Sequence, residues 1–152
     1  MSNSYLDPDS VSTDNISPPR NIKTDGIIDS KIVNLNIVSI ISRWIDKLDI
    51  NNKFAQFRGT YLPYKFNLLL RGSRNGLTPK KFHELCDGKP NTVTFIKVRG
   101  HEEILGGYNP LKWESSDSWC ITKDSFIFSF KSNDIFFKGA IISNVGDAGH
   151  AV

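Results

Sequence analysis

The side chains best suited to metal binding in this chain are two histidines and two cysteines. His83 and Cys86 are three residues apart and share a face if their segment is helical, and His101 and Cys120 follow them. Together they would supply four zinc ligands, but no close pair of cysteines anchors the set, and the spacing matches no recurrent zinc pattern. We therefore expect no metal and no cofactor, with Cys86 as a small buried hydrophobic residue.

A nucleophile and a base can also be drawn from His83 with Cys86 or Ser73. Such a pair needs an orienting acid and an oxyanion hole, which the sequence does not reveal. Ser73 is not in a G-x-S-x-G turn, because Arg71-Gly72-Ser73-Arg74-Asn75 lacks the second glycine. Cys86 lies near the C-terminal end of a predicted helix, where the helix dipole opposes a thiolate. We expect a protein that is not an enzyme; the alternative is a redox or hydrolytic enzyme that uses Cys86 or Cys120.

Basic residues gather around the glycine-rich turn at residues 71–76. The turn lacks the Gly-Lys-Ser/Thr of a phosphate-binding loop. We expect the cluster to be a solvated rim, with a docking patch for an acidic partner as the alternative. Its members are Arg71, Arg74, Lys80, Lys81 and Lys89.

Two helices must position these groups. Apolar residues recur at helical spacing from Asn36 and predict an amphipathic helix that ends near Asp49. The second helix begins after Thr78, a good N-cap, with Pro79 in the first position, and it stops at Asp87-Gly88.

Four strands are predicted beside them, and they make the fold class α+β with a mainly antiparallel sheet. Paired glycines within the third strand indicate a bulge or a close approach of the backbone. The last strand has Phe at alternate positions, so one of its faces is aromatic. The strands are Phe66–Leu70, Thr92–Val98, Ile104–Tyr108 and Ser125–Phe130.

The 152 residues of the chain, of 17.1 kDa, suit one ordinary domain. Residues 1–30 are rich in Ser, Asp, Asn and Pro and predict a disordered leader, and residues 31–59 predict the first helix and a linker. With a net charge of +3, no signal peptide and no membrane-length apolar run, we expect a cytoplasmic protein with no nucleic-acid partner and no transmembrane segment.

The amino-acid sequence of residues 60–152 resembles that of a TLDc domain. Phe66 to Leu77 resembles its first strand and "RGSRDG-F" turn, and Phe82 to Lys89 resembles its "FHE-CDGK" helix end. Thr92–Lys97 matches the second strand, Leu105–Pro110 with Trp113 the "GGY…W" element, and Asp124–Phe130 the "SFIFSF" strand. Five blocks occur in the family's order. The helix around Trp44 resembles the segment before the TLDc domain in fungal BTB–TLDc proteins.

This resemblance implies an antiparallel β-sandwich-like fold with flanking helices. It also implies a non-enzymatic protein-interaction module, linked to oxidative stress protection and to binding of the V-ATPase. The partner contacts we expect are Arg71, Ser73, Arg74 and Asn75. Structural roles are expected for Gly72, Gly76, Gly106 and Gly107, and for Trp113 as a packing residue.

The family pattern continues with further strands where this sequence stops, so we expect a copy that is incomplete at its C-terminus. The aromatic face of Phe126, Phe128 and Phe130 would then be exposed, and we expect the chain to aggregate, to self-associate through an uncovered sheet edge, or to need a partner that supplies the absent strands. A truncated fragment with no independent function is a further alternative.

Overall fold

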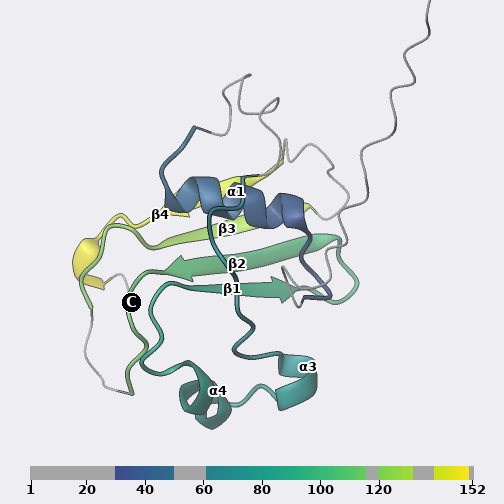
Figure 1. The fold of residues 1–152 in the computed structure, drawn as a ribbon, viewed down its shortest axis with the longest axis vertical. Coiled ribbons are helices and arrows are strands. Elements are labelled where there is room, and N and C mark those ends of the chain that lie inside the picture. The colour runs from purple at the N-terminus through teal and green to yellow at the C-terminus, as the bar shows by residue number, and fades with distance from the viewer. Residues whose placement is uncertain (1–29, 50–60, 116–119, 132–138, 151–152) are drawn as a thin grey trace, which may run out of the picture.

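A computed structural model describes residues 30–49, 61–115, 120–131 and 139–150. They form one antiparallel sheet and a few helices, which confirms the α+β class (Figure 1). The predicted leader lies outside the described residues, apart from Ser30, and so does most of the predicted linker. No helix among the described residues is long and apolar enough to cross a membrane.

The sheet is a four-stranded meander. Its strands follow one another in the order β1 (Thr92–Lys97), β2 (Glu103–Asn109), β3 (Phe126–Lys131) and β4 (Ile141–Asn144), each antiparallel to the next. The three predicted strands over residues 92–130 are confirmed. Strand β4 was not predicted; a short 3-10 turn, Ala148–His150, follows it.

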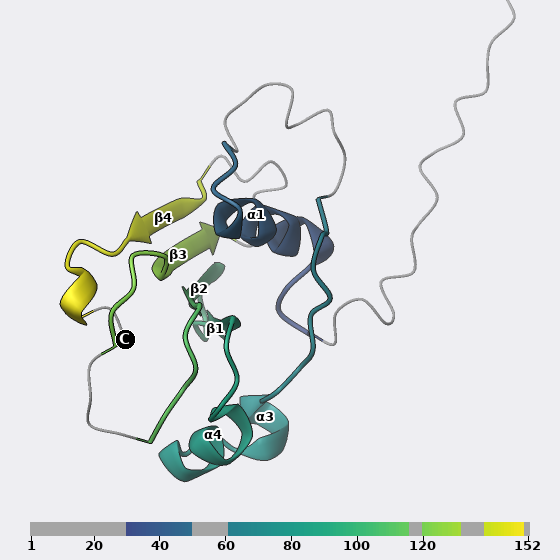
Figure 2. The ribbon, with the colours of Figure 1, turned by 60° about the vertical axis from the view of Figure 1, so that its left-hand side comes forward.

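One face of the sheet, which we call the inner face, is covered by helix α1 (Leu35–Ile45) (Figure 2). The indole of Trp44 packs against the aromatic rings of β3. The buried sheet residues beneath the helix are Ile104, Tyr108, Phe126, Phe128 and Phe130. The expectation that these phenylalanines are exposed is therefore wrong, because a helix of the same chain covers them.

Helix α1 has a cap at each end. The side chain of Asn34 accepts a hydrogen bond from the backbone N–H of Ile37 at 3.0 Å. At the other end, Lys47 has a φ of 55°, and the backbone N–H of Leu48 donates to the carbonyl of Arg43 at 2.8 Å, as in a Schellman motif. The helix thus ends four residues before Asp49, where the sequence predicted its end.

Gly106 is the place where the predicted close approach occurs. It lies opposite Phe95 on β1 and Phe128 on β3 without interruption of the register, so the glycine pair makes no bulge. A Cβ on Gly106 would lie 2.1 Å from the carbonyl oxygen of Thr94 and 2.4 Å from Cζ of Phe128. The missing side chain lets the Phe128 ring lie flat against β2.

The predicted strand at Phe66–Leu70 is wrong. This segment is extended, but it forms no strand and runs across the sheet strands rather than beside them (Figure 1). Leu62 and Phe66 pack against the core below α1. An apolar run of this length fits either role, and here burial of its side chains takes the place of strand pairing.

Helices α3 (Gly72–Asn75) and α4 (Pro79–Cys86) lie together past the β1 side of the sheet (Figures 1 and 2). The predicted start of α4 is confirmed: Thr78 Oγ1 accepts from the backbone N–H of Lys81 at 3.2 Å, and Pro79 is the first helical residue. Trp113 joins this helix to the sheet. Its indole meets Phe82 edge-on, with centroids 5.0 Å apart, and donates to Thr92 Oγ1 at 2.8 Å.

Candidate functional site

A Ser–His–Asp cluster lies at the C-terminal end of α4. Nδ1 of His83 is 2.8 Å from Oδ1 of Asp87, one helical turn further on. Ser115, from the segment after β2, donates to Oδ2 of Asp87 at 2.5 Å, and its hydroxyl is also 3.2 Å from the same Nδ1 of His83. These hydrogen bonds lower the pKa of the Asp87 carboxyl below its ordinary value of 3.8, with the Ser115 bond as the larger cause.

This geometry differs from that of a catalytic triad. In a triad the acid and the nucleophile bind opposite nitrogens of the imidazole, so that one nitrogen is oriented while the other accepts the proton. Here both groups meet at Nδ1, and the serine hydroxyl donates directly to the carboxylate. The cluster therefore ties α4 to the segment after β2 rather than activating Ser115.

Cys86 is the nucleophile in the alternative enzymatic function, but its environment disfavours nucleophilic attack. Cys86 is buried, and burial is the main cause that raises the pKa of its thiol above 9.0, with the charge of Asp87 adding to the effect. A raised pKa disfavours the reactive thiolate. Cys120 is half-buried, and both thiols are free.

The four zinc-ligand candidates of the sequence do not meet. Among the described residues, no group of three or more His, Cys, Asp or Glu side chains lies close enough to hold a metal ion. His101 is exposed in the turn between β1 and β2, whereas His83 lies on α4, a different element of the fold.

The expected partner-contact turn forms the short helix α3. Ser73 and Arg74 are exposed, whereas Arg71 and Asn75 are half-buried, and the Asn75 side chain accepts from the backbone N–H of Arg71 at 3.0 Å. Gly76, which ends the turn, has a φ of 79°, a conformation that L residues with a side chain rarely adopt. The turn is thus held by hydrogen bonds among its own residues, with Arg74 exposed to solvent.

The face of the sheet opposite α1, which we call the outer face, is rich in exposed apolar side chains. Each of the four strands contributes one, and their exposed fractions lie between 37 and 65%. They are Ile96, Leu105, Ile127 and Ile141. Gly107 also lies on this face, and its missing side chain leaves a hollow beside Ile127. At Gly72, away from the sheet, an added Cβ would be in ordinary contact with Leu77.

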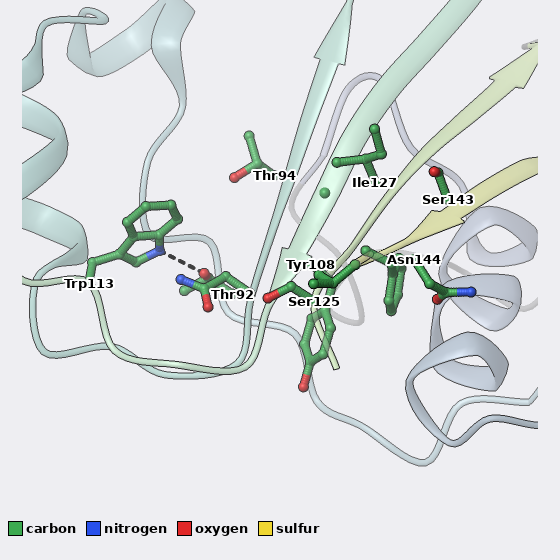
Figure 3. Close-up of a pocket in the computed structure, with 12 residues that line it drawn as sticks. Thr92, Thr94, Tyr108, Trp113, Ser125, Ile127, Ser143 and Asn144 are labelled. Atoms are coloured by element: carbon green, nitrogen blue, oxygen red, sulfur yellow. Dashed lines mark hydrogen bonds between the residues drawn. The ribbon is translucent and has the colours of Figure 1, made fainter. Parts of the chain in front are cut away.

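That hollow is part of a pocket of about 430 Å³ (Figure 3). Thr94 and Ile127 lie on either side of β2, and Trp113 lies at one end beside Thr92. Two buried polar atoms among its lining residues have no hydrogen-bond partner within the described part of the chain: Nδ2 of Asn109 and Oγ of Ser125. The full lining is Thr92, Thr94, Gly107, Tyr108, Asn109, Trp113, Ser125, Phe126, Ile127, Ser143, Asn144 and Val145.

Sequence reasoning found some of these features and missed others. The spacing of four between His83 and Asp87 was a usable signal for their contact, because residues one turn apart on a helix are neighbours. Nothing local connects Ser115 to them, since it is 28 residues from Asp87. Asn109 and Ser125 gave no signal either, because their unpaired atoms emerge only when β2, β3 and the segment at Trp113 come together.

Comparison with known proteins gives one match. The family model of the TLDc domain matches residues 28–145, which is more than half of the chain. No curated protein and no solved structure was found to match it.

Proposed function

Because the chain belongs to the TLDc domain family, we propose that it acts as a non-enzymatic protein-interaction module. The observation that carries this proposal is the outer face, where Ile96, Ile127 and Ile141 are more than half exposed. Exposed apolar side chains gathered on one face of a folded domain are typical of a binding site. Leu105, from the central strand β2, extends the same surface.

The chemistry of the reactive side chains supports a role other than catalysis. The TLDc domain family is not a known enzyme family. In the described part of the chain, the Ser115 hydroxyl donates to Asp87 instead of to an imidazole base, and the Cys86 thiol is buried with a raised pKa. Neither group has the environment of a nucleophile.

The partner we propose is the V-ATPase, and the process is protection against oxidative stress. Both are what the family resemblance implies, and with them we propose that the protein acts in the cytoplasm. An apolar face needs a partner with a complementary apolar surface, whereas the exposed turn around Arg74 suits an acidic one.

Binding of the full chain to purified V-ATPase tests the proposal by biolayer interferometry. We expect saturable binding that Ile127→Glu weakens about thirtyfold or more, as for a central contact residue. Ile121→Glu is the matched control, because Ile121 is 76% exposed but lies outside the sheet. Equal binding by both variants would remove the outer face from the contact.

A third variant separates the two candidate surfaces. Arg74→Glu reverses a charge on the α3 turn and leaves the sheet unchanged. If the outer face is the contact, Arg74→Glu binds V-ATPase within about threefold of the natural chain, as expected for a residue outside the contact. Loss of binding in Arg74→Glu alone assigns the contact to the turn. No binding by the natural chain contradicts the V-ATPase as the partner.

A further inference from the structure

One residue that lines the pocket on the outer face, Gly107, has no side chain. Gly107 is a β-strand residue with ordinary φ, and a Cβ added there would be 3.4 Å from the carbonyl oxygen of Phe126 and 3.7 Å from Cγ2 of Ile127. A branched side chain at residue 107 would therefore take up part of this hollow. Its volume of about 430 Å³ is within the usual range for ligand sites of about 300–1,000 Å³.

The two unpaired polar atoms give this pocket a chemical preference. Asn109 and Ser125 are each only 6% exposed, yet Nδ2 of Asn109 and Oγ of Ser125 meet no partner within the described residues. Oδ1 of Asn109 is already occupied by the backbone N–H of Leu111 at 2.8 Å, so the amide offers its donor side. Buried polar groups in native proteins are nearly always hydrogen-bonded. Both atoms are covered by neighbouring protein atoms, so their side chains must rotate toward the pocket before they meet an acceptor from outside.

The charge of the lining residues limits the class of ligand further. The described residues that line the pocket are all uncharged, and the indole of Trp113 and the side chain of Ile127 make much of its wall apolar. A carboxylate or phosphate would enter without a cationic partner, which is unfavourable in a partly buried site. A neutral carbonyl oxygen beside an apolar group satisfies both features.

We propose that this pocket binds an uncharged segment of a partner polypeptide, with one apolar side chain over Gly107 and a main-chain carbonyl oxygen accepting hydrogen bonds from Ser125 and Asn109. The inference rests on the proposed protein-interaction function and names its anchor. An extended peptide presents a side chain and a main-chain carbonyl at every residue. The exposed Ile127 makes the pocket continuous with the apolar outer face. The Ser125 hydroxyl turns toward the carbonyl by rotation about χ1.

A capped amino acid tests the pocket without knowledge of the partner. The ¹⁵N-labelled full chain is titrated with N-acetyl-phenylalanine methylamide, which has an apolar ring, two carbonyls and no charge. We expect saturable NMR shifts at the amides of Gly107, Ser125 and Ile127 and at the Trp113 indole N–H. N-acetyl-phenylalanine, which differs by a carboxylate, should bind at least about tenfold more weakly because it brings an unpaired charge.

Two variants of different kinds connect the shifts to the pocket. Gly107→Val places a branched side chain where the apolar group of the probe would lie, and valine suits a strand, so we expect binding to weaken at least about tenfold. Ser125→Ala removes one hydrogen-bond donor while keeping the space, and we expect about fivefold weaker binding. Ile96→Thr is the control on the same face outside the pocket and should bind the probe as the natural chain does. If Gly107→Val does not fold, Ser125→Ala still tests whether the probe binds in the pocket.

The outcomes separate this inference from the proposed function. Absent shifts, shifts spread over the surface, or equal binding by Ser125→Ala and the natural chain would overturn the pocket proposal, even if V-ATPase binding is intact. Line broadening of the outer face that grows with protein concentration would show a second copy as the occupant, and it would also overturn the proposal. Pocket binding together with loss of V-ATPase binding in Ile127→Glu would support both.

Discussion

The indole of Trp44 stacks on the ring of Phe130, with the two centroids 5.4 Å apart and the planes 20° from parallel. This contact joins the last turns of α1 to the far end of β3. The same indole also meets Phe126 edge-on at 6.1 Å, so one side chain of the helix spans the aromatic row of the strand. The aromatic face is thus a core of this chain, and the apolar surface left for a partner is the opposite one.

Removal of this indole should destabilise the domain strongly. We expect Trp44→Ala to lower the free energy of unfolding by about 3–5 kcal/mol, because it leaves a cavity between α1 and three phenylalanines. Denaturant unfolding followed by circular dichroism measures it. Ile121→Ala, at a 76% exposed site, should change stability by less than about 0.5 kcal/mol. Equal effects of the two would contradict the packing described here.

Adjacent glycines of β2 offer a matched pair of substitutions. In Gly106→Ala the new methyl group meets the backbone oxygen of Thr94 and the ring of Phe128, so we expect a loss of about 1–3 kcal/mol or more from overpacking. In Gly107→Ala the nearest atom to the new methyl group is the carbonyl oxygen of Phe126 at 3.4 Å, and we expect a loss of less than about 1 kcal/mol. Thermal and denaturant unfolding of both variants checks the order.

The Asp87 carboxyl should titrate at unusually low pH. Its pKa is lowered in the folded state, so its contacts contribute stability at pH values above the ordinary 3.8 and lose it as pH falls through the folded value. We expect Ser115→Ala to move the pKa of Asp87 upward, since the Ser115 hydrogen bond is the largest cause of its depression. Carbon-detected NMR titration of the side-chain carboxyl measures this, and an unchanged pKa would exclude the bond in solution.

The cysteines should differ in reactivity toward iodoacetamide. Because burial raises the pKa of the Cys86 thiol, we expect it to be alkylated much more slowly at pH 7.5 than an unstructured cysteine. Cys120, which is half-buried, should react first. Mass spectrometry of tryptic peptides after timed quenching gives both rates. Rapid modification of Cys86 in the folded chain would contradict this expectation and support the alternative of an enzyme that uses this cysteine.

Asp46, at the C-cap of α1, should affect the pKa of two tyrosine hydroxyl groups. Tyr61 donates to its carboxylate at 2.8 Å, and Tyr64 donates to the other oxygen, which raises the pKa of Tyr64 to about 12. A raised tyrosine pKa stabilises the fold below pH 10, and this contribution is lost as pH rises through 12. Ultraviolet titration should show the Tyr64 pKa falling toward 10 in Asp46→Ala; Glu84→Ala, at an exposed site on α4, is the control.

The sequence by itself determined the elements whose signals are local. Thr78 and Pro79 start α4 because capping involves residues within one turn, and alternate phenylalanines define one face of β3 because side chains alternate along any strand. The ordered blocks from Phe66 to Phe130 were enough to indicate the TLDc family, and the glycine pair indicated the close approach at Gly106.

Only the tertiary structure decided which surfaces are covered. Periodicity shows that Phe126–Phe130 has an apolar face, but it does not say that α1 lies on it, because that contact joins residues more than 80 positions apart. The same reason explains why the predicted strand Phe66–Leu70 is wrong: a strand needs hydrogen bonds to a neighbouring strand, and none of the four described strands pairs with this run. The Ser115–Asp87 bond and the unpaired atoms of Asn109 and Ser125 likewise exist only where distant segments meet, and no spacing along the chain encodes them.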